Sequence, residues 1–578
     1  MKRNYFFSLL LAITLLLSLC CTGCGKQSVP TAPADPAATE PDPTTPAEPE
    51  PGKPEDVPVR WQNAGALSFL PEEPVAVPKL SEMVYTRPDA EALIGEYEAL
   101  TEKVPVCEGA EELLNDYYAV AQHTHHFSTM YELAFYLYSA DTSDAERAGE
   151  YDYCDEQAGI LEEKQAELYA AFAASPWRDE LEEAYFGGGF FADYDGFNAG
   201  GQTYLELKQQ ENDLLFQYYE LASAADYSSA REIERNHEAS GSIFIELVKV
   251  RQQIAEAKGY DDYMDYSYAC DYMRDYSTAQ AREYLDQVKA LLAPLTDERF
   301  VLGDYSDWNE SKSMEMLSAA AEGMGGPIWE AFRFMSEYEL YDVGNSSHKM
   351  SAGYTDYLAD FEAPFLFVDP RTKDLLYTLF HEYGHFTDAY CNYGFSGSYE
   401  ISETYSQAME YLAFKYAEPF ADWARARNLR AVLADLLVYS VLQTGAYADF
   451  EMQVYALAPE ELSVERLDAI FGQCIEDYGI AGMSGVRLQS NYWSVYQHFF
   501  SYPGYVISYS DSAVAAMQIC RLEAEEPGAG VDAFCRLLDR THGKKFAAVL
   551  EEVGLDSPFE AATLEKTAAF LRDAFKQN

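Results

Sequence analysis

From about residue 60 onward, the order of apolar and polar positions is typical of amphipathic helices. Apolar side chains recur every three or four residues between Glu, Lys, Gln and Arg, a spacing that places them along one helix face. Strand patterns are few, and the best is a short aromatic and branched run at 364–368. We therefore expect a mainly α fold with a small β-sheet. The pattern is clearest at residues 88–103, 145–173, 228–258, 277–293, 401–416 and 428–457.

Composition and charge narrow the class of protein. The chain has 578 residues, of which 48% are hydrophobic and 15% aromatic, enough to bury a large core. Its formal net charge of −57 argues against nucleic acid and against binding anionic lipid through a basic patch. A solvated acidic surface explains this charge better than a specific cationic partner. With no repeat and no composition break after residue 60, we expect one large helical body, residues 60–578, in two lobes about a cleft.

The N-terminus has the pattern of an export signal. Lys2 and Arg3 precede an apolar run at 5–19, which is too short to span a membrane, and small residues and cysteines follow. This end resembles the processing site of bacterial lipoproteins, where a cysteine is lipidated after cleavage. We choose Cys24, because Thr22 and Gly23 before it are small, and residues 1–24 are then the signal. Cys20 and Cys21 stay open as alternatives, as does an ordinary secretory signal.

Residues 25–59 are rich in Pro, Ala, Thr and Glu and contain almost no large apolar side chain. Such a segment buries too little surface to fold, so we expect an extended tether between the lipid and the body. No later apolar stretch approaches a membrane-spanning length, so the remainder is expected to be soluble. Seven scattered cysteines, without a C-x-x-C pair, predict isolated thiols and no cysteine zinc site: Cys107, Cys154, Cys270, Cys391, Cys474, Cys520 and Cys535.

The strongest chemical signal is an H-E-x-x-H motif within a helix predicted at 369–390. Asp369 and Pro370 suit the helix start, and residues 392–394 supply the stop. His381 and His385 are four residues apart, so both imidazoles point the same way and can bind one metal ion. Glu382 projects to the side of this pair, where a carboxylate can reach a metal-bound water without being a ligand.

A catalytic zinc site needs a third protein ligand and an open position. A second helical stretch begins near residue 399, and Glu403 lies 18 residues after His385. Glu400, Glu403 and Glu410 can share one face of that helix. Spacing alone therefore leaves three candidates for the third ligand.

These motifs together resemble the oligoendopeptidase F and thimet oligopeptidase family of zinc metallopeptidases. That family has H-E-x-G-H on one helix and its third ligand in E-x-x-S-x-x-x-E on the next, as here from Glu403 to Glu410. The resemblance implies one zinc ion, with Glu403 as the third ligand and Glu410 as a supporting residue. Asp388, where the family often has histidine, is a candidate for a supporting role.

The resemblance extends over about residues 350–520, and we expect the catalytic core at about 340–520. Residues 351–354 and the strand at 364–368 resemble the family's substrate-binding edge strand. Residues 498–509 resemble its loop rich in histidine and tyrosine, whose side chains stabilise the oxyanion. By that match His498, Tyr505 and Tyr509 are catalytic, with Tyr502 a further alternative because the spacing is one residue longer than in the family.

The resemblance implies a deep channel between helical lobes that admits short peptides. The predicted function is an oligoendopeptidase in which Glu382 assists attack by zinc-bound water. The chain is expected to be a monomer on the outer face of a bacterial membrane, held there by its lipid. Endopeptidase action is favoured over dipeptidyl carboxypeptidase action. The alternative from another class is a non-catalytic lipoprotein that delivers peptides to a transporter.

A cluster of histidines at residues 123, 125 and 126 is a second candidate metal site. No acidic motif accompanies it in the sequence. We therefore interpret it as a polar surface or the edge of a cleft.

Overall fold

The computed structural model describes residues 76–186, 190–194, 201–224, 230–303, 309–371, 375–394, 398–417, 429–483, 489–538 and 545–576. Within these residues the fold is mainly helical with one small sheet, which confirms the expected class. The predicted signal at 1–24 and tether at 25–59 lie outside the described residues, so both stay predictions.

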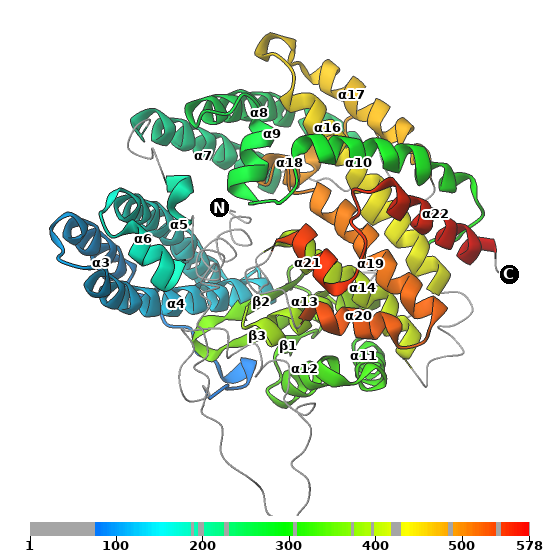
Figure 1. Cartoon of the computed structure of the whole chain (residues 1–578), viewed down its shortest axis with the longest axis horizontal. Helices are drawn as coiled ribbons and strands as arrows, with labels where there is room; N and C mark the ends of the chain where they lie inside the picture. The colour runs from blue at the N-terminus through cyan, green and yellow to red at the C-terminus, as the bar shows by residue number, and fades with distance from the viewer. Residues whose placement is uncertain are drawn as a thin grey trace, which may run out of the picture.

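The N-terminal helices form one side of the molecule, and the next ones lie above them in the view of Figure 1. Several of these helices begin at a capping side chain. Asp144, for example, accepts hydrogen bonds from the backbone N–H groups of Glu146 and Arg147 at the first turn of one helix. The helices of this part are α3 (Ala90–Lys103), α4 (Ala110–Ala140), α5 (Ala145–Ala174), α6 (Arg178–Leu181), α7 (Gly201–Ala224), α8 (Ala230–Ala257) and α9 (Tyr263–Tyr266).

The remaining helices complete the other side of the molecule (Figure 1). They are α10 (Thr278–Leu291), α11 (Glu310–Met324), α12 (Gly326–Glu337), α13 (Leu375–Asn392), α14 (Tyr399–Tyr416), α16 (Thr444–Tyr455), α17 (Val464–Asp477), α18 (Gln497–Ser501), α19 (Ile507–Glu525), α20 (Ala529–Leu538), α21 (Phe546–Val553) and α22 (Ala561–Lys576).

One three-stranded sheet lies beside α13. Its order is β1 (Tyr341–Asp342), β3 (Ala363–Val368), β2 (Gly353–Leu358), with β1 parallel and β2 antiparallel to β3. The strand predicted at 364–368 is therefore confirmed as β3, and every residue of β3 is buried. In the described sheet β2 is an edge strand, paired only on the β3 side.

Five of the six clearest predicted helices appear within a few residues of their expected bounds, as α3, α5, α8, α10 and α14. The sixth, 428–457, is helical from Leu429 to Tyr455, with a wide π-helical segment at Leu436–Gln443. By length and composition this helix could cross a membrane, which corrects the expectation that no later stretch approaches that length. However, 83% of its most apolar window is buried inside the fold, as in the core helix of a folded domain.

The structure corrects the predicted start of the helix that contains the H-E-x-x-H motif. Asp369 follows β3, residues 370–371 form a turn, and the described part of α13 begins at Leu375. The carboxylate of Asp369 accepts hydrogen bonds from the backbone and side chain of Arg371. The predicted stop is confirmed, because α13 ends at Asn392 and Gly394 has a φ of 128°.

Helix α13 is buried between the sheet on one side and α14 on the other, and α19 packs against α14. Its apolar side chains, among them Leu376, Leu379, Phe380 and Phe386, are fully buried. The two-lobed body and deep channel stay predictions. A described cavity of about 480 Å³ is lined by Gly323, Lys415 and Glu523, far in sequence from the histidine motif.

Candidate metal centre

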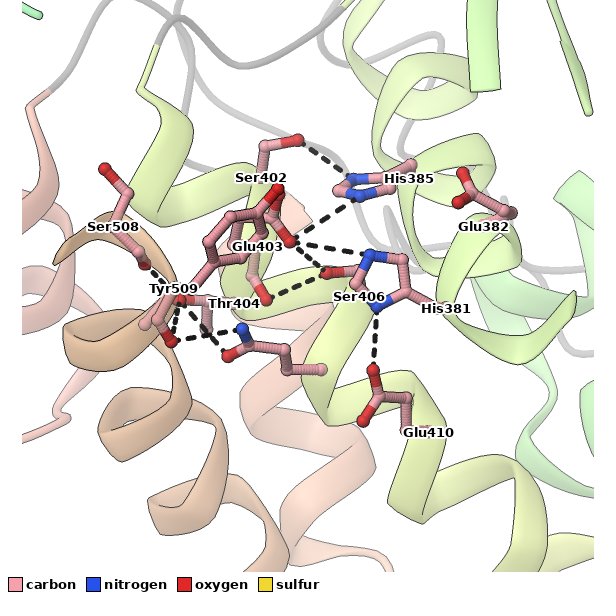
Figure 2. A network of polar contacts seen from close by, with 12 residues as sticks. His381, Glu382, His385, Ser402, Glu403, Thr404, Ser406, Glu410, Ser508 and Tyr509 are labelled. Carbon is pink, nitrogen blue, oxygen red and sulfur yellow. Dashed lines mark hydrogen bonds and ion pairs between the residues drawn. The ribbon is translucent and has the colours of Figure 1, made fainter. Parts of the chain in front are cut away.

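Helix α13 presents two imidazoles on the face that α14 covers. His381 and His385 are one turn apart, and their rings lie 4.9 Å apart between centroids. The opposite face of α13 is apolar and packs into the core, which fixes the direction of the histidine face. In Figure 2 both rings point toward the same carboxylate on the neighbouring helix, and Glu382 lies to one side.

The backbones of α13 and α14 are in close contact at Gly384. A Cβ at this position would lie 2.6 Å from the backbone Cα of Ser406 and from the carbonyl oxygen of Tyr405. Only glycine allows this approach, which explains the G of H-E-x-G-H physically. The contact brings Glu403, one turn before Ser406 on α14, up to the two histidines.

Three donor atoms converge at this point. The Nε2 atoms of His381 and His385 lie 3.5 and 3.8 Å from Oε2 of Glu403. The ligand atoms of the three residues all lie within 4.8 Å of one another. Two imidazole nitrogens and one carboxylate oxygen are the protein donor set of a catalytic zinc site. The residues present therefore fit the metal that the sequence motifs imply.

Each presumptive ligand has a partner that orients it. His381 donates from Nδ1 to Oε1 of Glu410 at 2.7 Å, and His385 Nδ1 is 3.0 Å from Oγ of Ser402 (Figure 2). Ser406 donates to Oε2 of Glu403 at 3.0 Å. With the Nδ1 atoms engaged in this way, the Nε2 atoms of both histidines remain for a metal ion.

The electrostatics of this centre favour a cation. Burial alone would lower the pKa of His381, but the hydrogen bond to Glu410 and the charges of Glu403 and Glu410 raise it to about 9. Burial and the neighbouring His381 charge hold the pKa of His385 well below its ordinary value. Burial also raises the pKa of Glu382 to about 7, against the opposing charge of His381. Positive charge at the Nε2 side is therefore stabilised by the surrounding carboxylates.

The loop of residues 498–509 reaches this centre through Tyr505. Its hydroxyl donates to Oε1 of Glu403 at 3.1 Å. Tyr509 lies 5.1 Å from Tyr505 between ring centroids, and His498 lies 5.8 Å from Tyr505 and 6.0 Å from Tyr509. Tyr502, the further alternative, has its ring 5.7 Å from that of His498. All four predicted residues thus lie together, with Tyr505 in direct contact with a metal-site carboxylate.

His498 itself packs against an aromatic ring. Its ring is nearly parallel to that of Tyr496, at 15° and 4.9 Å between centroids. Burial lowers the pKa of His498 to about 4, so the imidazole is neutral at physiological pH. A neutral imidazole can still donate one hydrogen bond.

A buried arginine that sequence reasoning missed holds this loop beside α14. Arg274 donates to Oε1 of Glu400 at 2.7 Å, to the carbonyl oxygen of Gly504 at 2.9 Å and to Oγ of Ser508 at 2.6 Å. Glu451, on α16, accepts a hydrogen bond from the N–H of Gly504 at 3.0 Å. These contacts of Arg274 and Glu451 join residues that are far apart in the sequence, so no local sequence pattern indicates them. Ser402, the partner of His385, was missed for the same reason.

The other candidates do not join the metal centre. Glu400 pairs with Arg274 instead. Asp388 is fully buried, and its Oδ1 accepts a hydrogen bond from the side chain of Asn392 at 2.8 Å. Neither residue is in the group of side chains able to hold one ion.

The histidine cluster on α4 divides into separate surface pairs. His123 lies 2.7 Å from a carboxylate oxygen of Glu96, and His126 lies 2.7 Å from one of Asp360. Their side chains are 61% and 51% exposed. These exposed pairs agree with the interpretation as a polar surface.

Comparisons with known proteins show what this chain and its fold are similar to. Residues 80–194 match the family model of the Peptidase M3 N-terminal domain. PZ peptidase A with an inhibitor is similar in structure, with a TM-score of 0.72, 21% identity, and coverage of 86% of this chain and 99% of that one. An oligoendopeptidase F from Bacillus anthracis has a TM-score of 0.70, 22% identity, and coverage of 86% and 98%.

A more distant likeness is the oligoendopeptidase F of Enterococcus faecium, with a TM-score of 0.51, 14% identity, and coverage of 85% of this chain and 96% of that one. No curated protein matches the chain. At these identities the structural likenesses establish the fold. Residues 80–194 therefore resemble a Peptidase M3 N-terminal domain and the chain has the fold of oligoendopeptidase F, which confirms the resemblance drawn from its motifs.

Proposed function

We propose that the protein is a zinc-dependent peptidase that hydrolyses short peptides. This proposal rests on one observation. The side chains of His381, His385 and Glu403 converge, and the carboxylate of Glu382 lies beside them. The Peptidase M3 N-terminal domain and the peptidase fold support the reaction class. A carrier that only binds peptides has no use for this set of groups.

His381, His385 and Glu403 would hold the zinc ion, which supplies Lewis acidity that lowers the pKa of water and polarises a peptide carbonyl. Glu382 accepts a proton as the water oxygen bonds to the carbonyl carbon. It then passes the proton to the peptide nitrogen, and the C–N bond breaks. His498, Tyr505 and Tyr509 can donate hydrogen bonds to the developing oxyanion. Tyr505 has to leave Glu403 to do so.

The substrate is proposed to be a short, extended peptide cleaved internally. In the described sheet β2 is paired with β3 on one side only, and an extended peptide can add as a further strand on its other side. A dipeptidyl carboxypeptidase would need a group that binds the substrate's C-terminal carboxylate, and endopeptidase action needs none. Mapping the products of one labelled peptide, with a free and an amidated C-terminus, distinguishes the two.

A quenched fluorogenic peptide tests the activity. We expect turnover that a chelator abolishes and stoichiometric zinc restores. Glu382→Gln should retain zinc and lose nearly all turnover, since the amide cannot accept the proton. Peptide binding without cleavage in the zinc-loaded protein would favour the peptide-carrying alternative. Undiminished turnover by the Glu382→Gln variant would remove Glu382 as the base.

We also propose that the enzyme is held by a lipid at Cys24 on the outer face of a bacterial membrane. The support is the export signal pattern at 1–24 and the tether pattern at 25–59. Mass spectrometry of the mature N-terminus should find a diacylglycerol-modified Cys24. The Cys24→Ala variant should lose the lipid and leave the membrane fraction. A lipid on Cys20 or Cys21 would correct the position, and an unmodified N-terminus would contradict the anchor.

A further inference from the structure

The strand β2 contacts Glu382 directly, through a residue that the histidine motif does not include. The hydroxyl of Thr355 lies 2.8 Å from the carbonyl oxygen of Glu382 and 3.1 Å from its carboxylate Oε2. Both residues are buried, with 7% and 6% of their surfaces exposed. In the part of the chain that the structure describes, no other hydrogen bond reaches this carboxylate.

The neighbouring residue on the same face of β2 leaves room for the other carboxylate oxygen. Gly353 and Thr355 are two apart on the strand, so both face α13. A Cβ on Gly353 would lie 3.3 Å from Oε1 of Glu382 and 2.4 Å from Cγ2 of Thr378. The strand can therefore approach α13 this closely only because position 353 has no side chain.

Together these contacts define one orientation of the carboxylate. Glutamate has three rotatable side-chain bonds, and the neighbouring His381 and His385 face α14, so the helix alone does not orient Glu382 toward the metal position. The hydroxyl of Thr355 shares its proton between the backbone carbonyl oxygen and Oε2 of Glu382, and position 353 leaves room for Oε1. Strand β2 therefore limits the movement of this carboxylate from one side.

We propose that Thr355 is a positioning residue for Glu382, which rests on the proposed peptidase function. The edge strand then has two tasks: one edge receives the peptide, and one face orients the group that accepts the proton. A carboxylate that is free to rotate spends less time in the reactive geometry, and displacement by about 1 Å can lower turnover by about a hundredfold. The loss should appear in kcat, because the Thr355 hydroxyl contacts Glu382 and is not among the groups proposed to bind peptide or zinc.

Thr355→Val tests this proposal, because valine keeps the shape and removes the hydroxyl. We expect kcat to fall by roughly ten- to a hundredfold with KM and zinc stoichiometry unchanged. Thr355→Ser, which restores a hydroxyl, should recover most of the lost kcat. The matched control is Thr567→Val on α22, where a buried threonine hydroxyl donates to the carbonyl oxygen of Thr563 at 2.9 Å, and its kcat should equal that of the wild type.

Gly353→Ala combined with Thr378→Ser is a second, independent variant. The serine removes the Thr378 methyl, so the crowding from the new Cβ falls on Oε1 of Glu382. We expect zinc to be retained and kcat to fall, while Thr378→Ser alone stays close to the wild type. This variant decides the question if Thr355→Val does not fold.

The possible failures are distinguishable. A wild-type protein without chelator-sensitive peptide hydrolysis would overturn the proposed function itself. A wild type that is active, with full kcat in a folded Thr355→Val variant, would overturn only the role of Thr355. A rise in KM at constant kcat, or a Thr355→Ser variant no better than Thr355→Val, would show that the residue merely supports the strand.

Discussion

At the scale of single residues, the two histidines of the metal centre have unlike partners. His381 is backed by the carboxylate of Glu410, and His385 by the hydroxyl of Ser402. A carboxylate makes the imidazole a stronger electron donor to a metal, whereas a hydroxyl mainly orients it. Tyr377 also donates to Glu410 and so limits its movement.

We therefore predict that Glu410→Gln weakens zinc binding more than Ser402→Ala does. The loss for Glu410→Gln should be on the order of 10- to 100-fold, because the amide no longer supplies charge. Competition with a chelator of known affinity measures both constants. Glu91→Gln, an exposed residue on α3, is the control and should bind zinc like the wild type. Equal zinc affinity in all variants would show that these partners do not tune the metal.

A second prediction at this scale concerns His498. If its imidazole donates to the oxyanion, His498→Phe should lower kcat by roughly 100-fold while zinc content stays the same. The ring that replaces it can still stack on Tyr496, so the thermal stability should change little. Single-turnover kinetics and zinc analysis of the same sample make the comparison. An unchanged kcat would assign His498 to packing alone.

At the scale of elements, the metal centre depends on one helix crossing. Helices α13 and α14 meet backbone to backbone at Gly384, and that contact sets the separation between the two histidines and Glu403. The atoms that a Cβ would meet belong to the backbone of α14, so no side-chain rotation can make room.

Gly384→Ala should therefore separate the two helices. We expect a loss of about 1–3 kcal/mol in the free energy of unfolding, and much weaker zinc binding, because Glu403 moves away from the histidines. Gly159→Ala in α5 is the matched control. A Cβ there meets nothing within 4 Å, so alanine should stabilise the helix slightly. Urea unfolding measures the stability of both variants, and zinc titration measures their zinc affinity. Wild-type zinc affinity in Gly384→Ala would contradict the claim that the contact at Gly384 positions Glu403.

At the scale of the whole molecule, a buried ion pair between α7 and α8 also contacts α18, at the start of the loop of residues 498–509. Arg251 on α8, whose side chain is 1% exposed, donates to Oε1 of Glu211 on α7 at 2.6 Å. Its guanidinium also donates to the carbonyl oxygens of Phe499 and Phe500 in α18. Burial alone would raise the pKa of Glu211, but the charges of Lys208 and Arg251 outweigh it and lower the pKa to about 2.

This pair should make part of the stability depend on pH. Because the pKa of Glu211 is lower in the folded protein than its ordinary 4.5, its contribution is complete above about pH 4.5 and is lost as the pH falls toward 2. Glu211→Gln should therefore cost about 3 kcal/mol at pH 7, since it leaves a buried arginine without its counter-charge. The difference from the wild type should shrink as the pH falls below about 4.5.

Urea unfolding of wild type and variant at several pH values between 3.5 and 7 measures this difference. Glu256→Gln, an exposed carboxylate on α8, is the control and should show a small difference that does not vary with pH. A Glu211→Gln difference that is equally flat would contradict the pairing.

Much of the fold was predictable from local pattern. The periodicity at 145–173 and 228–258 predicted α5 and α8 almost to their ends, since an amphipathic face is visible along one helix. Asp369 and Pro370 carry the marks of a helix start, but residues 370–371 form a turn, and the carboxylate of Asp369 binds Arg371. The long apolar helix at 429–455 could not be recognised as a core helix before its packing was known.

The sequence by itself determined the candidate metal-binding pair, because a spacing of four residues on a helix places two side chains on one face. It could not choose among Glu400, Glu403 and Glu410 without the family resemblance, since all three share a face of α14. Only the tertiary structure decided that Glu403 lies near the Nε2 atoms of both histidines, whereas Glu410 contacts Nδ1 of His381 and Glu400 pairs with Arg274. The same holds for Ser402, Thr355 and Tyr505, because a contact between distant segments depends on how close two backbones can approach, and no local pattern records that distance.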